Sequence, residues 1–332
     1  MTAAASNGAG PRIAVTGRIP QEGLDMLNEA GLVDAWVSLE VPTVQQVHDI
    51  VHGAHAAVTL LTTKVDDAFL DAAGPQLKVV ANVAVGYNNI DVAACAARGV
   101  IATNTPGVLT EATADIAMSL ILMTTRRLGE GERVIRSQTP WQWGMFYMLG
   151  SGIQGRQLGI VGMGDIGCAL ARRAKAFGMK IAYSNRRPVA PALEAELGAT
   201  VMSLDELLST SDVVSINCPY NPTTHHLIGA AELATMKPTA FLINTARGPI
   251  VDEAALAAAL NSGEIAGAGL DVFEEEPKVH PQLLQCENAV LIPHLGSATL
   301  ETRAAMARLA AHNAINVLSG GIPPTPIPVP AG

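Results

Sequence analysis

The stretch that decides the fold is "GRQLGIVGMGDIGCALARRAKAFG", residues 155–178. An apolar run, a glycine-rich turn and an amphipathic run rich in alanine follow one another, which predicts a strand, a tight turn and a helix. In this context the pattern GxGxxG indicates a dinucleotide site, whose pyrophosphate would lie at the helix N-terminus. Gly162 permits the sharp turn, Gly164 lets the backbone approach the pyrophosphate, and Gly167 allows close helix–strand packing. The expected cofactor contacts are Gly162, Gly164, Asp165, Ile166 and Gly167.

The next expected strand ends in "KIAYSNRRP" (180–188), where dinucleotide folds usually place an Asp or Glu against the adenosine ribose. Here the chain has Asn185, Arg186 and Arg187. A solvated loop is the ordinary interpretation. The functional interpretation is a clamp for a 2′-phosphate, because guanidinium groups bind phosphate and a carboxylate would repel it. We therefore expect NADP(H) to be preferred, with NAD(H) possible.

Outward from this unit, short apolar runs alternate with helical patterns along nearly the whole chain. This alternation predicts an α/β fold with two Rossmann-like or flavodoxin-like parallel-sheet domains and an active site in the cleft between them. We expect residues 1–107 and 298–332 to form a discontinuous substrate-binding domain and residues 108–297 to form the dinucleotide-binding domain. The expected strands lie near 12–17, 56–61, 77–84, 100–104, within 155–164, and near 180–185, 212–219, 240–246, 265–272 and 289–294.

Composition narrows the function classes. The 332 residues carry a net charge of −9 and are 49% apolar, which favours a globular protein over a nucleic-acid or anionic-membrane binder. The four cysteines are far apart, so we expect no metal site, no disulfide framework and a cytoplasmic location. The first eleven residues lack the features of a signal peptide and suggest a short tail. No apolar run has the length of a membrane span.

Polar residues follow several expected strands in the second domain. Arg247, Asp271 and His294 each come at or just after a strand, and Glu276 follows shortly after Asp271. Taken singly, each is most simply a surface arginine, a solvated acid or a hydrogen-bonded histidine. Because ligands of open parallel sheets bind beyond the carboxyl ends of the strands, we expect these side chains to converge.

Several longer phrases together resemble one family. The chain is similar to the D-isomer-specific 2-hydroxyacid dehydrogenases over about residues 55 to 318, and is most like the glyoxylate/hydroxypyruvate reductase branch. The phrases that carry the resemblance are "VAVGYNNIDV" (83–92), "TNTPGVLTEATADIAM" (103–118), "GMGDIG" (162–167), "YSNRR" (183–187), "NTARGPIVDEAAL" (244–256), "GLDVFEEEP" (269–277) and "PHLGSAT" (293–299).

The resemblance implies a catalytic set of Arg247, Glu276 and His294. Arg247 would bind the carboxylate and polarise the carbonyl of a 2-keto acid, and His294 would donate the proton. Glu276 would raise the His294 pKa and fix its tautomer. The resemblance also implies cofactor contacts from Thr113, Cys218, Pro219, Thr245, Ala246, Arg247, Asp271, His294 and Gly296. It implies substrate contacts from Leu61, Val85, Gly86, Arg247 and His294.

Within this resemblance, three positions narrow the substrate. Formate dehydrogenases have Gln at the position of Glu276, and phosphite dehydrogenases have Lys at the position of Val85. NAD-preferring members usually have an acid at the position of Asn185. We therefore expect NAD(P)H-dependent reduction of glyoxylate or hydroxypyruvate to the D-2-hydroxy acid. The alternatives are a larger 2-keto acid, such as 2-ketogluconate or an aryl-pyruvate, and a non-catalytic dinucleotide sensor similar to the C-terminal-binding corepressors.

Three further features have ordinary and functional interpretations. The aromatic run "WQWGMFYM" (141–148) is expected to be a buried arm; the family suggests a homodimer through 110–150, in which Trp141 or Trp143 could reach the neighbouring subunit's site. His225 and His226 resemble a metal pair but are expected to be surface residues without nearby carboxylates. Cys218 is expected to face the cofactor or to be packed rather than to act as a nucleophile.

Overall fold

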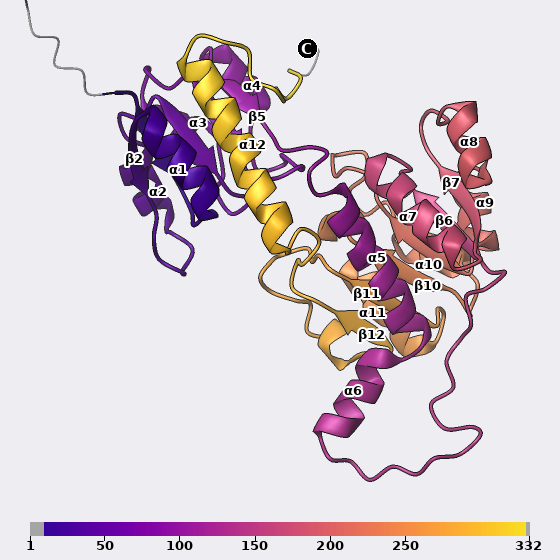
Figure 1. Cartoon of the computed structure of the whole chain (residues 1–332). Coiled ribbons are helices and arrows are strands. Elements are labelled where there is room, and N and C mark those ends of the chain that lie inside the picture. Colours follow the sequence, from indigo (N-terminus) through magenta and orange to yellow (C-terminus); the bar gives the residue numbers. More distant parts are fainter. Residues whose placement is uncertain (1–9, 330–332) are drawn as a thin grey trace, which may run out of the picture. The chain divides into compact units, whose positions relative to one another are not determined.

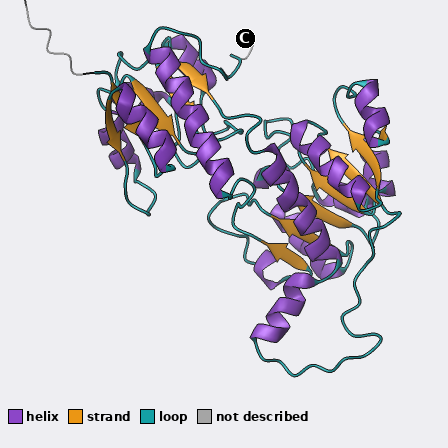
Figure 2. Cartoon of the chain, viewed as in Figure 1, coloured by secondary structure: helices purple, strands orange, loops and turns teal. Residues whose placement is uncertain are grey.

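We describe a computed structural model of the chain, in which residues 10–329 are described. The predicted N-terminal tail lies mostly outside these residues. The chain divides into two compact units, Met1–Leu109 with Thr299–Gly332 (unit 1) and Thr110–Ala298 (unit 2). Each unit has its own parallel sheet with helices on both faces (Figures 1 and 2), which confirms the predicted α/β class. The assignment of substrate binding to unit 1 and of dinucleotide binding to unit 2 stays a prediction.

Unit 1 contains a five-stranded parallel sheet in the order β2-β1-β3-β4-β5, the flavodoxin-like order. The long C-terminal helix α12 packs with α1 against one face, and α2, α3 and α4 cover the other. The elements are β1 Arg12–Val15, α1 Gln21–Ala30, β2 Leu32–Ala35, α2 Val44–Val51, β3 Ala56–Thr59, α3 Asp67–Ala73, β4 Val79–Asn82, α4 Val92–Ala97, β5 Ile101–Thr103 and α12 Leu300–Leu318.

A buried polar side chain of α12 adds a specific connection between the C-terminal segment and the rest of unit 1. Asn313 of α12 is fully buried, and its amide nitrogen donates to the Asn104 carbonyl (3.2 Å) and to the Thr325 hydroxyl (2.8 Å). Its amide oxygen accepts the Thr325 N–H (3.1 Å). Because a buried amide is costly unless it is bonded, this network joins the chain after β5 to the segment after α12.

Unit 2 contains a seven-stranded parallel sheet in the order β12-β11-β10-β9-β6-β7-β8. The chain begins at β6 and proceeds to both sides of it, as in Rossmann folds. The elements are α5 Thr110–Thr125, α6 Leu128–Arg136, β6 Gln157–Val161, α7 Asp165–Ala176, β7 Lys180–Ser184, α8 Pro191–Leu197, β8 Ala199–Val201, α9 Leu204–Thr210, β9 Val213–Ile216, α10 Ala230–Thr235, β10 Phe241–Asn244, the 3-10 turn Gly248–Ile250, α11 Glu253–Ser262, β11 Gly267–Leu270, the 3-10 turn Leu283–Gln285 and β12 Ala289–Leu291.

Side-chain alternation in these strands builds the two cores of unit 2. Phe241 and Ile243 of β10 belong to the core with α5 and α7, whereas Leu242 points to the core with α10 and α11. Strands that are buried on both faces read as continuous apolar runs, which is why they are visible in the sequence. Among the described residues, no helix is long and apolar enough to cross a membrane.

Candidate active site

In the turn between β6 and α7, each of three glycines meets a different requirement of the backbone or of its surroundings. Gly162 has φ +93°, and a Cβ there would lie 2.5 Å from the Cys218 backbone nitrogen. A Cβ at Gly167 would lie 2.8 Å from the Gly162 carbonyl oxygen, so α7 packs closely on the turn. A Cβ at Gly164 would meet no atom within 4 Å. The space beside Gly164 is therefore open at the first turn of α7.

This open space suits the phosphates of a dinucleotide. Gly164 is the N-cap of the twelve-residue helix α7 and offers no side chain to cap it. The turn follows β6, which lies between β7 and β9 in the sheet. The strand order reverses between β6 and β9, and open sheets bind ligands at such a point. Just after β9 and β10, Asn217 Oδ1 and Thr245 Oγ1 are buried and have no hydrogen-bond partner within the described residues. A polar ligand at the strand ends would satisfy them, so the residues present suit a dinucleotide.

The cationic turn after β7 is fixed at both ends. Asn185 Oδ1 accepts the Met163 N–H (2.6 Å), and its Nδ2 donates to the Met163 carbonyl (3.3 Å), so Asn185 holds the glycine turn. The buried Tyr183 hydroxyl accepts the Val189 N–H (3.1 Å) and bonds the Glu194 carboxylate. The role of Asn185 as a clamp on the glycine turn was not visible in the sequence.

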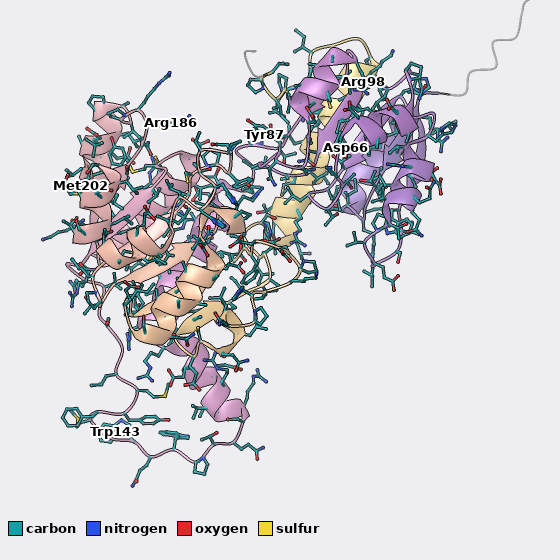
Figure 3. All side chains as sticks on the ribbon, turned by 180° about the vertical axis from the view of Figure 1, so that it is seen from behind. Asp66, Tyr87, Arg98, Trp143, Arg186 and Met202 are labelled. Atoms are coloured by element: carbon teal, nitrogen blue, oxygen red, sulfur yellow. The ribbon has the colours of Figure 1, made fainter. Side chains whose placement is uncertain are left out.

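The guanidinium groups of this turn are exposed. Arg186 and Arg187 lie between the two fixed points, and neither forms an ion pair within residues 10–329. Figure 3 shows Arg186 at the margin of unit 2. Two cations that neutralise no carboxylate of their own unit remain available to an anionic ligand.

The His294–Glu276 pair is the central contact of the site. His294 Nδ1 lies 2.8 Å from Glu276 Oε2, and Glu276 Oε1 accepts the Phe273 N–H (3.0 Å). Partial burial by itself would raise the Glu276 pKa. The hydrogen bond and charge of His294, the Phe273 N–H and the charge of Arg247 outweigh burial, so the pKa of Glu276 is lowered. The carboxylate is thus ionised and bonded to the imidazole.

The His294 backbone is held in an unusual conformation by Asp271. His294 has φ +51°, in the left-handed region that non-glycine residues rarely adopt. Asp271 is 1% exposed, and its two carboxylate oxygens accept the N–H groups of Leu295 (2.5 Å) and Gly296 (2.8 Å). Burial raises the Asp271 pKa. A buried carboxylate therefore fixes the backbone that follows His294.

Thr113 joins the same region from the first turns of α5. Its hydroxyl donates to the Gly296 carbonyl (3.1 Å), across 183 residues of sequence. A Cβ at Gly296 would lie 3.1 Å from an Asp271 oxygen, so a small residue suits this position. The structure thus brings together Thr113, Asp271, His294 and Gly296. The expected contacts of Thr113 and Asp271 with the cofactor stay predictions.

Arg247 lies three residues after β10 in a turn that Asn244 shapes. The Asn244 amide accepts the Ala246 N–H (3.0 Å) and donates to the Arg247 carbonyl (2.9 Å). The Arg247 guanidinium donates to the Ala246 carbonyl (2.7 Å). Burial lowers the Arg247 pKa, and the attraction of Glu276 opposes this shift. Sequence reasoning identified Arg247 but missed Asn244, although both belong to the same motif.

The expected substrate residues of unit 1 lie in loops that follow its strands. Leu61 comes two residues after β3, and Val85 and Gly86 follow β4. The Asn104 side chain donates to the Val85 carbonyl (2.8 Å), and the Asn82 side chain donates to the Gly86 carbonyl (3.1 Å). These bonds fix the orientation of both peptide groups. Their contact with a substrate stays a prediction.

Two expectations about individual side chains are wrong. The aromatic run is not buried within the chain: Trp143 is 75% and Phe146 is 88% exposed, because the segment after α6 extends away from the core of unit 2 (Figure 3). His226 is not an isolated surface residue, since its Nε2 lies 3.0 Å from Glu274 Oε2, which the sequence places 48 residues away. Within residues 10–329, no three His, Cys, Asp or Glu residues are grouped to hold a metal.

Cys218 is packed at the end of β9 rather than placed as a nucleophile. Its backbone lies so close to Gly162 that a Cβ on the glycine would collide with it. Burial raises the pKa of the thiol to about 11. The next residue, Pro219, accepts a hydrogen bond from the Thr224 hydroxyl (2.9 Å). A thiol with a raised pKa is a poor nucleophile near neutral pH.

Comparison with known proteins places this geometry in a family. Residues 118–296 match the family model described as D-isomer specific 2-hydroxyacid dehydrogenase, NAD binding domain. A glyoxylate reductase from Thermococcus onnurineus is 48% identical, over 95% of each chain.

Solved structures show the same architecture. An NADPH-dependent glyoxylate/hydroxypyruvate reductase from Sinorhizobium meliloti, solved with NADP and malonate, is 37% identical with a TM-score of 0.82, covering 96% of each chain. A D-mandelate dehydrogenase from Rhodotorula graminis is 30% identical with a TM-score of 0.87, covering 96% of this chain and 98% of that one. The fold, the glycine turn and these similarities agree: the chain belongs to the D-isomer specific 2-hydroxyacid dehydrogenase family.

Proposed function

We propose that the protein reduces a small 2-keto acid, glyoxylate or hydroxypyruvate, to the 2-hydroxy acid with a nicotinamide dinucleotide. The observation that carries the proposal is the His294–Glu276 contact of 2.8 Å, in the unit that holds the glycine turn and Arg247. Similarity to proteins named glyoxylate reductase, at 48% identity in the example from Thermococcus onnurineus, supports this substrate class.

Arg247 has the chemistry to bind the substrate. A 2-keto acid presents a carboxylate and an adjacent carbonyl, and the planar guanidinium can donate to both. During reduction negative charge develops on the carbonyl oxygen, which a nearby cation stabilises most strongly at a site shielded from water. The bonds from Asn244 to the Arg247 turn position this cation before the substrate binds.

His294 and Glu276 have different roles in the proton transfer. The reduced nicotinamide, when bound, supplies the hydride that adds to the carbonyl carbon. His294 has Nδ1 bonded to Glu276, so its Nε2 is the nitrogen that donates a proton to the developing alkoxide. The Glu276 carboxylate, ionised because its pKa is lowered, fixes the ring orientation and stabilises the imidazolium. Oxidation of the hydroxy acid uses the same groups in reverse.

We also propose a preference for NADP(H) over NAD(H). Its support is the exposed pair Arg186 and Arg187, together with the absence of an acid at Asn185. The similar reductase from Sinorhizobium meliloti is described as NADPH-dependent and was solved with NADP. Because Asn185 is engaged with Met163, the two arginines are the residues that would discriminate the 2′-phosphate.

A homodimer formed through the segment 110–150 is proposed for the same protein. Beyond α6, a series of large apolar side chains is exposed, and such a patch is typical of an interaction surface. Next to it, a groove of about 620 Å³ is lined by Leu128, Ile135 and Met148 among other residues. The exposed apolar residues of the arm are Trp141, Trp143, Met145, Phe146, Tyr147 and Leu149.

A larger 2-keto acid is the second candidate substrate. The structure of a D-mandelate dehydrogenase from Rhodotorula graminis matches this chain with a TM-score of 0.87. Its name indicates an aryl substrate on the same fold. The lower identity, 30% against 48% for the glyoxylate reductase, makes the small substrate the first choice.

The first prediction concerns turnover. Purified protein should oxidise NADPH in the presence of glyoxylate or hydroxypyruvate, faster than with phenylpyruvate or 2-ketogluconate. His294→Ala should lower kcat about 10²- to 10⁴-fold because the proton donor is lost. Arg247→Ala should lower kcat/KM about 10²-fold or more. The decrease of NADPH absorbance with time measures the turnover of the wild type and of both variants.

The control for these variants is His312→Ala, which removes an exposed histidine of α12 in unit 1 and should leave turnover near the wild-type value. A dinucleotide sensor would bind NADPH, as measured by fluorescence, and show no turnover with any of the four keto acids. That result would contradict the proposed reaction.

The second prediction concerns acid stability. A carboxyl group whose pKa is lowered on folding adds stability above its unfolded pKa, here near 4.5, and loses it as the pH falls through the folded pKa. Glu276→Gln should therefore unfold about 1 kcal/mol more easily near neutral pH, after allowance for partial exposure. The difference should vanish in acid. Urea unfolding across pH measures it, with exposed Glu264→Gln as control; a difference that grows in acid would refute the lowered pKa.

The third prediction concerns cofactor choice. Replacing Arg186 and Arg187 by Ala should lower kcat/KM for NADPH and leave that for NADH nearly unchanged, shifting their ratio about 10- to 100-fold. Arg172→Ala, which removes a cation already paired with Glu196 at 2.8 Å, is the matched control and should not change the ratio. An unchanged ratio in the double variant would show that the turn is a solvated loop.

The fourth prediction concerns assembly. Sedimentation should show a dimer for the wild type and a shift toward monomer for Trp143→Ser with Phe146→Ser, because burial of two aromatic side chains is lost. Leu39→Ser, at an 88% exposed apolar position of unit 1, is the control and should remain dimeric. A monomeric wild type would contradict the proposed homodimer.

A further inference from the structure

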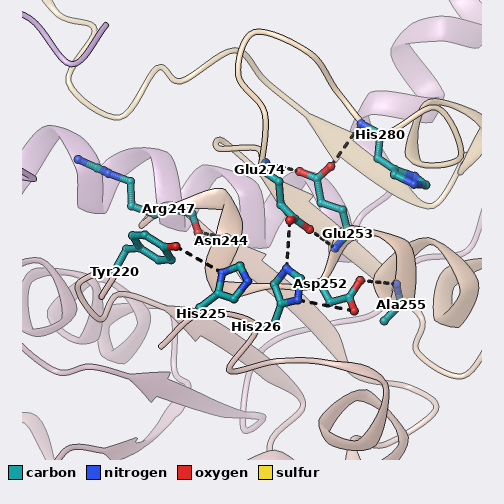
Figure 4. A network of polar contacts seen from close by, with 10 residues as sticks. All are labelled: Tyr220, His225, His226, Asn244, Arg247, Asp252, Glu253, Ala255, Glu274 and His280. Carbon is teal, nitrogen blue, oxygen red and sulfur yellow. Dashed lines mark hydrogen bonds and ion pairs between the residues drawn. The ribbon is translucent and has the colours of Figure 1, made fainter. Parts of the chain in front are cut away.

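Glu253, the first residue of α11, is a buried carboxylate that the proposed reaction does not use. It is 5% exposed, and it forms no ion pair with any Lys, Arg or His among the described residues. Burial raises the pKa of its carboxyl group. A buried carboxylate without a cation is expensive unless backbone donors satisfy it, and Figure 4 shows the polar contacts that surround it.

The two oxygens of Glu253 hold the two ends of one short loop. Oε1 accepts the Glu274 N–H (2.7 Å), and Oε2 accepts the His280 N–H (3.3 Å). Between these two points lies Glu276, whose carboxylate bonds His294. One side chain of α11 therefore spans the loop 274–280 that carries Glu276.

A second set of contacts fixes the same loop from the other side. The Glu274 carboxylate accepts the Glu253 N–H (2.8 Å) through one oxygen and contacts His226 Nε2 (3.0 Å) through the other. The two glutamates thus accept each other's backbone N–H groups, as Figure 4 shows. This reciprocal arrangement fixes the loop against both α11 and the segment of His226.

A backbone approach completes the attachment of this loop to the Arg247 turn. A Cβ at Gly248 would lie 1.9 Å from the Phe273 carbonyl carbon and 2.3 Å from the Glu274 nitrogen. Gly248 directly follows Arg247, so the Arg247 turn and the beginning of the Glu276 loop pack backbone against backbone. A shift of the loop would therefore change the spacing of the two proposed active-site loops.

Capping of α11 does not explain Glu253. The N-cap of this helix is Asp252, whose side chain already accepts the Ala255 N–H (2.9 Å). A glutamate at the first helical position normally points to solvent and interacts with the helix dipole at little cost. Glu253 instead turns inward and makes both side-chain hydrogen bonds to another loop.

We propose that Glu253 is a positioning residue that sets the place of Glu276 and, through it, the orientation of the His294 ring. The inference rests on the proposed reduction of a 2-keto acid and adds to it a residue that touches neither substrate nor cofactor. Asp271 and Arg247 are charged groups whose fields act together with those of Glu276 and His294. Of these four residues, Glu276 alone lies on the loop 274–280 that Glu253 spans.

The test compares Glu253→Ala and Glu253→Gln with the wild type. Ala removes both bonds, whereas Gln keeps the volume and one acceptor oxygen and so holds only one end of the loop. We expect kcat for glyoxylate reduction to fall about 10- to 100-fold for Ala and less for Gln. KM should change less than about threefold, because the bonds from Asn244 that hold the Arg247 turn remain.

A pH profile separates positioning from general destabilisation. When Glu276 moves away from His294, its carboxyl group loses a partner that lowers its pKa, so the acidic limb of the kcat profile should move to higher pH in both variants. Glu232→Ala is the matched control, since Glu232 also lies in the first turn of a helix and accepts a backbone N–H, that of Gly229 (3.0 Å). It should lose stability without moving the limb.

The outcomes distinguish this inference from the proposed function. A wild type that turns over no keto acid contradicts the proposed function. An active wild type whose folded Glu253→Gln variant keeps both kcat and the acidic limb contradicts the positioning role. If Glu253→Ala does not fold, Glu253→Gln alone decides, because it preserves the volume of the side chain.

Discussion

Parallel pairing of β10, β11 and β12 is the constraint on which the candidate site depends. In this register Asn244 pairs with Leu270, and Leu270 pairs with Leu291, so the three strands end along one edge of the sheet. Asp271 follows β11 directly, and Arg247 and His294 each come three residues after their strands. Residues that are 47 positions apart in the sequence thus leave the sheet at the same edge. The chemistry then requires only short loops to bring the side chains together.

Those loops are fixed mainly by carboxylates that accept backbone N–H groups. Asp271 binds Leu295 and Gly296, Glu276 binds Phe273, and Glu253 binds Glu274 and His280. A charged acceptor in a shielded setting makes stronger hydrogen bonds than a neutral one, and each bond specifies a position of the backbone. The acids of this region therefore differ in purpose. Of these three carboxylates, that of Glu276 bonds the ring of the proposed proton donor, while the other two determine where the donor and its partner lie.

The sequence predicted those features that short-range physics determines. The glycine turn was predictable because each glycine answers a local demand, namely the positive φ at Gly162 and the close packing at Gly167. Buried parallel strands were visible as apolar runs. The short strands β2 and β8 were missed because both are partly exposed and lack such a run. The aromatic arm was expected to be buried on composition alone, and composition does not say which molecule covers it.

Contacts that are distant in sequence were beyond sequence reasoning, and Asn185 shows the consequence. From its place after the second strand, Asn185 was interpreted as a missing acid that leaves room for a 2′-phosphate. Its amide instead uses both ends on the Met163 backbone. Aspartate there could still accept the Met163 N–H, but it would lose the donated bond and bring a carboxylate toward the Met163 carbonyl. Substitution of Asn185 would therefore change the glycine turn and the ribose environment together, so that discrimination between the two dinucleotides is attributed more cleanly to Arg186 and Arg187.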